Sequence, residues 1–115
     1  MKEQRPLRVA ELIKREVSRI LLSEIQDPRL RGFTITRVEM SPDLKLAKIF
    51  VSFGGQEKEE EKYEALKKAT KFIRGELASR IRIKFMPEIV FVADPTLEKA
   101  IKVVELLSRM EKATQ

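Results

Sequence analysis

Apolar residues recur along this chain with two different spacings, and the changes of spacing divide it into helices and strands. Three- and four-residue spacing is typical of amphipathic helices, and two-residue alternation is typical of strands. The pattern predicts helices over residues 7–25, over residues 58–81 and after Asp94, and strands over residues 33–40, 44–53 and 88–93. The middle helical stretch reads as one long helix that is weakened near Thr70 and Gly75. We expect it to divide there, which gives the order α-β-β-α-α-β-α.

Turn residues fix how the first two strands meet. Ser41-Pro42-Asp43 is a short turn signal, so these strands are expected to form an antiparallel hairpin. The alternation in the first strand slips, and a bulge near Thr36 and Arg37 would explain the slip. The link from the second strand to the third contains helix and is long enough for a parallel crossover. The predicted fold class is α+β, with a small three-stranded mixed sheet and helices packed on one face.

Composition narrows the function classes. The 115 residues suit a single domain over residues 1–115, and 43% hydrophobic residues are ordinary for a folded protein. There is no Cys, which excludes disulfides and thiolate metal sites and fits a reducing cytosol. With no His either, the usual general base and metal ligands are missing, so neither an enzyme nor a cofactor is predicted. No apolar run reaches the roughly 18 residues of a membrane span, and the amino-terminal segment lacks a signal-peptide core.

The charge pattern points to a polyanionic partner. The chain has 24 Lys and Arg against 18 Asp and Glu, with a pI of about 9.7. Between Lys71 and Lys84 there are five basic residues and one acidic residue, Glu76. The alternative is an ordinary solvated helix face, and the one-sided charge favours a phosphate-binding face. The candidate RNA-binding residues are Arg5, Arg8, Lys67, Lys68, Lys71, Arg74, Arg80, Arg82 and Lys84.

Two other kinds of protein fit parts of this pattern. A general single-stranded nucleic-acid binder would need exposed rings for base stacking, yet aromatic residues make up only 6% of the chain. Phe50 and Phe85 are the phenylalanines most expected to be exposed. A protein-interaction module without RNA contact would explain the helices but not the clustered basic charge. The apolar stripes are expected to be used up by one sheet and its helices, which predicts a monomer.

Five segments together resemble the bacterial ribosome-binding factor A (RbfA) family over residues 5–107. They are RPLRVAELIKREV, IQDPRL, VEMSPDLKLAKIFVSF, ATKFIRGELASRIRI and MPEIVFVADPTLEKA, in this order. The resemblance implies a type II KH-like fold and a cytoplasmic, non-catalytic factor. It implies binding to the small (30S) ribosomal subunit, help in late maturation and 5′-end processing of 16S rRNA, and release by a ribosome-associated GTPase.

The resemblance also implies a bend in the middle helical stretch. Many KH domains bind nucleic acid with a Gly-x-x-Gly loop, and this chain has no such spacing. The family has an Ala-x-Gly kink between two helices in its place. Ala69, Thr70 and Lys71 occupy that position here, with Lys71 where Gly is usual. The kink is therefore expected at these three residues or nearer Gly75.

Overall fold

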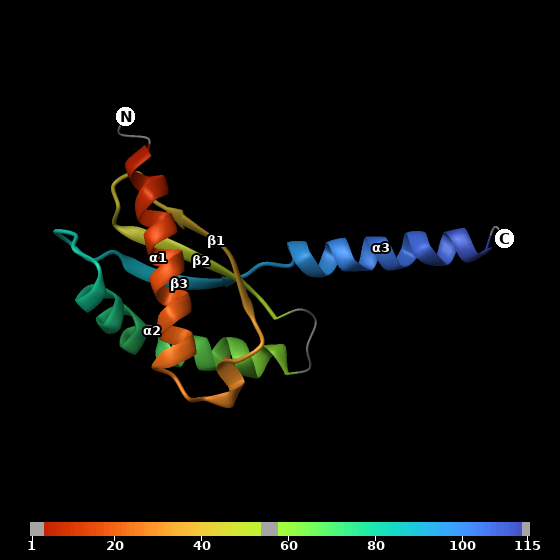
Figure 1. The fold of residues 1–115 in the computed structure, drawn as a ribbon, viewed down its shortest axis with the longest axis horizontal. Helices are drawn as coiled ribbons and strands as arrows, with labels where there is room; N and C mark the ends of the chain where they lie inside the picture. Colours follow the sequence, from red (N-terminus) through yellow and green to blue (C-terminus); the bar gives the residue numbers. More distant parts are fainter. Residues whose placement is uncertain (1–3, 54–57, 114–115) are drawn as a thin grey trace.

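A computed structural model of the protein describes residues 4–53 and 58–113 (Figure 1). Three helices, one short 3-10 turn and three strands follow one another in these residues. In chain order they are α1 (Gln4–Ser23), the 3-10 turn (Pro28–Leu30), β1 (Thr34–Met40), β2 (Leu46–Ser52), α2 (Glu59–Arg80), β3 (Glu88–Ala93) and α3 (Thr96–Ala113). The predicted strands and the first and last helices are present, with bounds that differ by a few residues, and a single helix replaces the two that were expected in the middle.

The three strands form one mixed sheet in the order β1-β2-β3. β1 and β2 pair antiparallel, and β2 and β3 pair parallel, which confirms both the hairpin and the crossover. The register shifts between Ile35, which pairs with Val51, and Arg37, which pairs with Phe50. Thr36 is therefore the extra residue of a bulge, at the place where the alternation slips in the sequence.

The core lies between the sheet and the two helices α1 and α2. On the central strand β2, Ala47, Ile49 and Val51 are fully buried, whereas Lys48 between them is exposed. α1 contacts β1, α2 contacts β3, and the two helices contact each other. The fully buried helical side chains that fill the space between them are Ile13, Val17, Ile20, Leu66, Ile73 and Leu77. One face of the sheet is thus covered, and the other carries partly exposed side chains.

The expected division of the middle helix is wrong, because α2 is a single continuous helix. Ala69, Thr70 and Lys71 all lie within it. The Thr70 hydroxyl donates to the Leu66 carbonyl one turn earlier, at 2.9 Å, so its polar group is satisfied inside the helix. Lys is a good helix former, unlike the Gly of the family's kink. A Cβ added at Gly75 would meet nothing within 4 Å, so no close packing requires glycine there.

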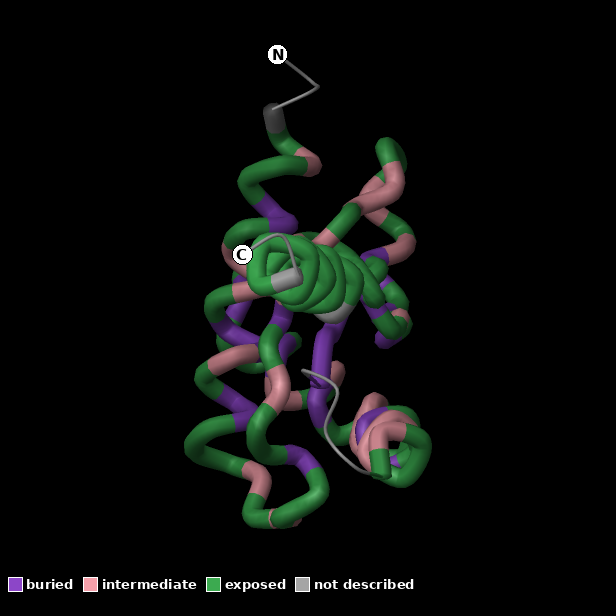
Figure 2. The backbone as a smooth tube through the Cα atoms, turned by 90° about the vertical axis from the view of Figure 1, so that its right-hand side faces the viewer, coloured by how far each residue is buried: buried purple, intermediate pink, exposed green. Residues whose placement is uncertain are grey.

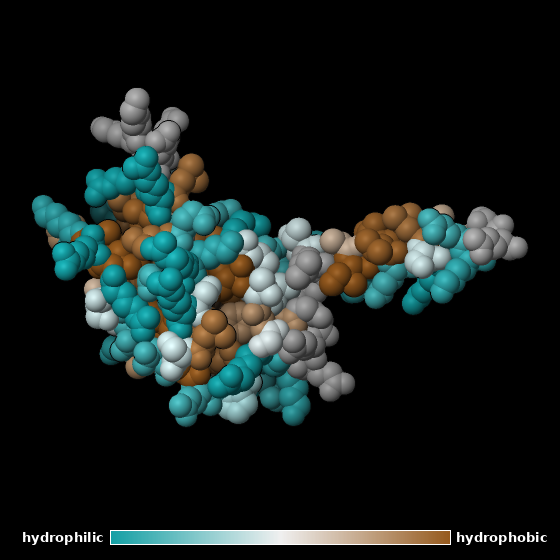
Figure 3. All heavy atoms as spheres, viewed as in Figure 1, coloured by the Kyte–Doolittle hydropathy of each residue, from teal (hydrophilic) through white to brown (hydrophobic). Residues whose placement is uncertain are grey.

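The expectation that the helices pack on one face is wrong for α3. This helix leaves the sheet and extends away from the body (Figure 1), and Figure 3 shows hydrophobic side chains gathered along it. Seen end-on in Figure 2, it is exposed over its described length. Its large apolar side chains, each 45–65% exposed, are Ile101, Val103, Val104, Leu106, Leu107 and Met110. The monomer prediction assumed that these residues were covered, so it loses that support.

Asp94 joins the base of α3 to the sheet. Its side chain is buried and accepts hydrogen bonds from the Thr36 hydroxyl at 2.7 Å and from Arg37 Nη1 at 3.1 Å. Its other oxygen accepts from the Thr96 backbone N–H at 3.0 Å, which caps α3. Hydrogen bonding by Thr96 first, and then by Thr36, lowers the pKa of Asp94 to about 2. The bulge residue Thr36 therefore has a structural role in directing α3.

The lowered pKa of Asp94 predicts an acid-dependent loss of stability. Because the folded-state pKa lies below the unfolded value of 3.8, Asp94 contributes its full stabilisation above about pH 4. That contribution is lost as the pH falls toward 2. We expect Asp94→Asn to show a smaller fall in Tm between pH 5 and pH 2 than the wild type, measured by circular dichroism melts. Glu11→Gln, which changes an exposed carboxylate, is the control. Equal falls in all three proteins would contradict the assignment.

Candidate nucleic-acid interface

Three of the predicted RNA-binding residues lie together on the outer side of α2. Leu66, Ile73 and Leu77 face the core, and this places Lys67, Lys68 and Lys71 on the exposed side of the helix. Lys67 lies 3.5 Å from Glu64 and above the Tyr63 ring, at 4.8 Å from its centroid. Lys68 and Lys71 make no ion pair with another described residue, so their charges are available to a ligand.

Arg74 has protein partners. Its Nε and Nη2 atoms donate to the carbonyls of Pro87 and Met86, each at 3.0 Å, and Nη2 lies 3.4 Å from Glu88. These contacts attach the segment before β3 to the side of α2. The sequence pattern grouped Arg74 with the solvent-facing cations. Helix periodicity does not show that the segment containing Met86 and Pro87, twelve residues later, packs beside Arg74.

Arg80 also has protein partners. Its Nη2 donates to Glu24 at 3.1 Å, and its guanidinium lies 3.9 Å from both Glu16 and Glu76. Glu16 is almost completely buried on α1, and it also pairs with Arg19 at 3.0 Å. Arg80 therefore joins the end of α2 to α1. The charge pattern predicted five cations on one solvent-facing surface. That prediction is wrong for Arg74 and Arg80, whose guanidinium groups contact other parts of the protein.

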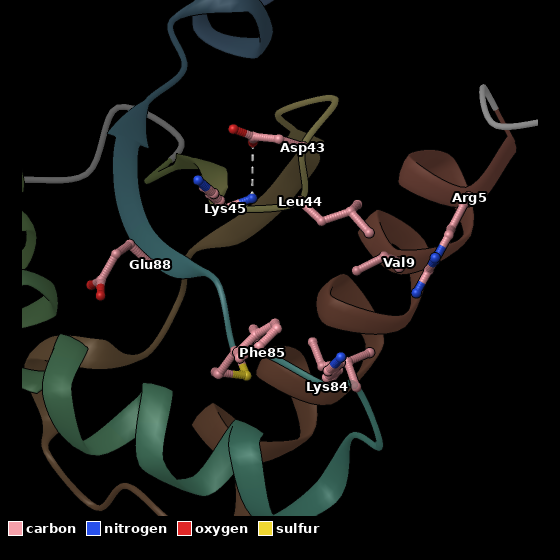
Figure 4. Close-up of a pocket in the computed structure, with 10 residues that line it drawn as sticks. Arg5, Val9, Asp43, Leu44, Lys45, Lys84, Phe85 and Glu88 are labelled. Carbon is pink, nitrogen blue, oxygen red and sulfur yellow. Dashed lines mark hydrogen bonds between the residues drawn. The ribbon is translucent and has the colours of Figure 1, made fainter.

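The remaining predicted cations lie near the ends of α1 and α2. Arg82 and Lys84 are exposed on the segment between α2 and β3, and Arg5 and Arg8 are exposed on the first turns of α1. Arg5 and Lys84 line the same cavity, of about 430 Å³ (Figure 4). Arg8 lines a different hollow, beside Leu7 and Arg15. The structure thus brings Arg5 and Lys84 together at one cavity, apart from the lysines on α2 and from Arg8 and Arg82.

Sequence reasoning missed two residues of these surfaces. Lys45, next to the hairpin turn, lines the cavity with Arg5 and Lys84. Phe72 is 48% exposed beside Lys68 in a hollow between α2 and the 3-10 turn. In the sequence, only its positive charge next to a turn could have indicated Lys45.

The two phenylalanines expected to be exposed differ. Phe85 is 77% exposed, as predicted. Phe50 is only half-buried on the open face of the sheet, where the Arg37 guanidinium covers its ring at 3.8 Å. Phe85 is therefore the better placed of the two for stacking with a base.

Other chemistry finds little support in residues 4–53 and 58–113. They contain no group of three or more His, Cys, Asp or Glu side chains that could hold a metal ion. No helix in the same ranges is long and apolar enough to cross a membrane. The arrangement offers exposed cations and exposed rings, which suit binding of an anionic polymer.

Comparison with known proteins agrees with the resemblance seen in the sequence. The family described as "Ribosome-binding factor A" matches residues 5–107. A ribosome-binding factor A from Halothermothrix orenii is 44% identical over 113 residues, covering 97% of this chain and 93% of the relative. One from Gloeobacter violaceus is 46% identical over 114 residues, covering 96% of this chain and 88% of the relative.

Solved structures show the same KH-like fold. The crystal structure of ribosome-binding factor A from Thermus thermophilus has a TM-score of 0.68 and 25% identity, covering 76% of this chain and 94% of that one. A homology model of the Thermus thermophilus factor, fitted into the cryo-EM map of a 30S–RbfA complex, has a TM-score of 0.61 and 26% identity. It covers 73% of this chain and 89% of that one. This chain belongs to the ribosome-binding factor A family.

Proposed function

We propose that this protein binds the 30S subunit and assists late maturation of 16S rRNA, including its 5′ end, by contact with RNA. The family is one of non-catalytic assembly factors. A relative of known fold is described in a complex with the 30S subunit. The proposal includes a cytoplasmic location, residues 1–115 acting as one RNA-binding domain, action as a monomer, and release by a ribosome-associated GTPase.

The observation that carries the RNA contact is a set of exposed cations without acidic partners. Within the described part of the chain, six of the nine predicted residues make no ion pair. They are Arg5, Arg8, Lys68, Lys71, Arg82 and Lys84. Unpaired cations attract phosphates strongly because each contact releases counterions from the nucleic acid. Arg74 and Arg80 already donate to protein groups, which leaves fewer donors for RNA, so we assign them to the fold.

Two charge-matched variants test the proposal. Lys68→Gln/Lys71→Gln removes two exposed charges from α2, and Lys99→Gln/Lys102→Gln removes two with the same spacing from α3. We expect the α2 variant to bind 30S subunits more weakly, with a log–log salt slope shallower by about 1.4–1.8, since each phosphate contact contributes roughly 0.7–0.9. The α3 variant should resemble the wild type.

Co-sedimentation at several salt concentrations measures both quantities. Wild-type protein should be compared on 30S subunits, 50S subunits and free RNA. Equal binding to all three would favour a general single-stranded RNA binder, and no binding to any would favour a protein-interaction module. An α2 variant with unchanged affinity and slope would contradict the placement of the contacts.

A further inference from the structure

We propose that the cavity lined by Arg5, Lys45, Lys84 and Phe85 binds one unstacked nucleotide of single-stranded RNA. The base would stack on Phe85 and enter the cavity, and the flanking phosphates would contact the three cations. The inference rests on the proposed RNA binding and adds to it a defined site and a class of ligand. The chain has no Gly-x-x-Gly loop, and the proposed nucleotide site does not require one.

The cavity has a suitable size and lining for a base. Its volume of about 430 Å³ lies within the range of about 300–1,000 Å³ that small ligands occupy. Three separate parts of the chain form it: the start of α1, the β1–β2 hairpin turn and the segment before β3 (Figure 4). Its apolar lining residues are Val9, Leu44, Ile83, Phe85 and Met86. An apolar cavity with a polar rim suits the flat face and polar edge of a base.

Phe85 is held in an exposed position by its neighbours. Although Phe85 is 77% exposed, Pro87 is fully buried two residues later. The carbonyls of Met86 and Pro87 both accept hydrogen bonds from Arg74 on α2. The segment that carries Phe85 is therefore held against α2 by Arg74. Stacking of a base on the Phe85 ring would then require little further ordering of the chain. Lys84 Nζ lies over the same ring, 5.5 Å from its centroid, and so keeps a cation beside the proposed stacking position.

The opposite wall of the cavity contains a strained residue. Leu44 has φ = 62°, a left-handed conformation that is unfavourable for a leucine. The turn holds it there: the Leu44 N–H donates to the Ser41 carbonyl at 2.9 Å, and the Ser41 hydroxyl accepts from the Leu46 N–H at 2.9 Å. This conformation places Leu44 in the cavity wall. Left-handed residues occur in many hairpin turns, and strained ones also cluster at binding sites.

The cavity is lined by more positive than negative charge. Arg5, Lys45 and Lys84 make no ion pair with a described residue. Of the two lining carboxylates, Asp43 keeps its charge next to Lys45, because its hydrogen-bond donors are neutral, whereas Glu88 pairs with Arg74. Asp43 accepts from the Ser41 hydroxyl at 2.7 Å and from the Lys45 backbone N–H at 3.1 Å, and Glu88 lies 3.4 Å from Arg74. The three cations therefore favour an anionic ligand, and the apolar lining next to an exposed ring favours a nucleotide.

A short RNA with a fluorescent base tests this site. The probe is a single-stranded uridine pentamer with 2-aminopurine at its centre, whose fluorescence falls when the base stacks. We expect full-length wild-type protein to quench it, and Phe85→Ala to bind about 5- to 150-fold more weakly, as loss of one base–ring stack predicts. Phe85→Leu, which keeps an apolar side chain, should also lose quenching. Lys45→Gln should make the salt slope shallower by about 0.7.

Leu22→Ala, which removes an 80% exposed apolar side chain from the other end of α1, should bind the probe like the wild type. Unchanged Tm values would show that the Phe85 variants remain folded. The proposal is overturned if Phe85→Ala binds and quenches like the wild type, or if the wild type does not bind the probe. It is also overturned if a labelled hexaglutamate peptide binds more tightly than the RNA and depends on Phe85, which would indicate an acidic protein partner.

Parallel co-sedimentation separates this inference from the proposed function. If the wild type binds 30S subunits but Phe85→Ala leaves quenching unchanged, the cavity assignment is wrong and the function stands. If quenching depends on Phe85 but the wild type does not sediment with 30S subunits, the nucleotide site stands and the proposed function is wrong.

Discussion

Replacing Ile49 by alanine should lower the free energy of unfolding by about 2–5 kcal/mol. Ile49 is fully buried on the central strand, so the truncation leaves a cavity between the sheet and its helices. Domains of this size are stable by only about 5–15 kcal/mol, and the loss is therefore a large fraction of the total. Chemical denaturation measures it as a lower midpoint with an unchanged slope.

Ile101→Ala makes the same chemical change on α3 and is the matched control. Ile101 is 45% exposed, so its truncation should alter the free energy of unfolding by no more than about 0.5 kcal/mol. A large loss in the Ile101 variant would show that α3 is packed against another surface in solution. A small loss in the Ile49 variant would contradict the assignment of the core to this face of the sheet. The Ile49 and Ile101 variants together test whether the core lies under the sheet and whether α3 is unpacked.

The sheet was predictable because its signals are local. The alternation along β2 identifies which side chains are buried, and the slip at Thr36 marks the bulge without any knowledge of the partner strand. The path of α3 was not predictable in this way. Its apolar spacing is the same as that of a packed helix, and its direction depends on the contacts of Asp94 with Thr36 and Arg37, almost sixty residues earlier.

The candidate site was only partly predictable for the same reason. Helix spacing correctly placed Lys68 and Lys71 on the exposed side of α2. It could not distinguish them from Arg74, because the carbonyls that Arg74 binds come from a later segment of the chain. The cavity brings Lys45 close to Arg5 and Lys84 only in the folded protein. A resemblance to a family can suggest a kink by analogy, but it did not show that one helix runs without a break through Ala69, Thr70 and Lys71.

Reversing the charge of Arg80 should have a very different effect from reversing that of Arg82, two residues later. Arg80 is surrounded by Glu16, Glu24 and Glu76, and its side chain is 27% exposed. Arg80→Glu would remove this cation and add a fourth carboxylate. We expect a loss of about 2–3 kcal/mol, between the values for an exposed and a buried ion pair. Glu16 keeps Arg19 as a partner, which limits the loss.

Arg82→Glu should leave the free energy of unfolding within about 0.5 kcal/mol of the wild type, because Arg82 is exposed and makes no ion pair with a described residue. It should instead weaken binding to 30S subunits and make the salt dependence shallower, as loss of a phosphate contact requires. Denaturation and co-sedimentation on both variants separate the two roles. If Arg80→Glu is as stable as the wild type and loses 30S binding, Arg80 contacts RNA despite its carboxylate partners. If Arg82→Glu binds with unchanged affinity, the RNA contact does not extend to the segment that follows α2.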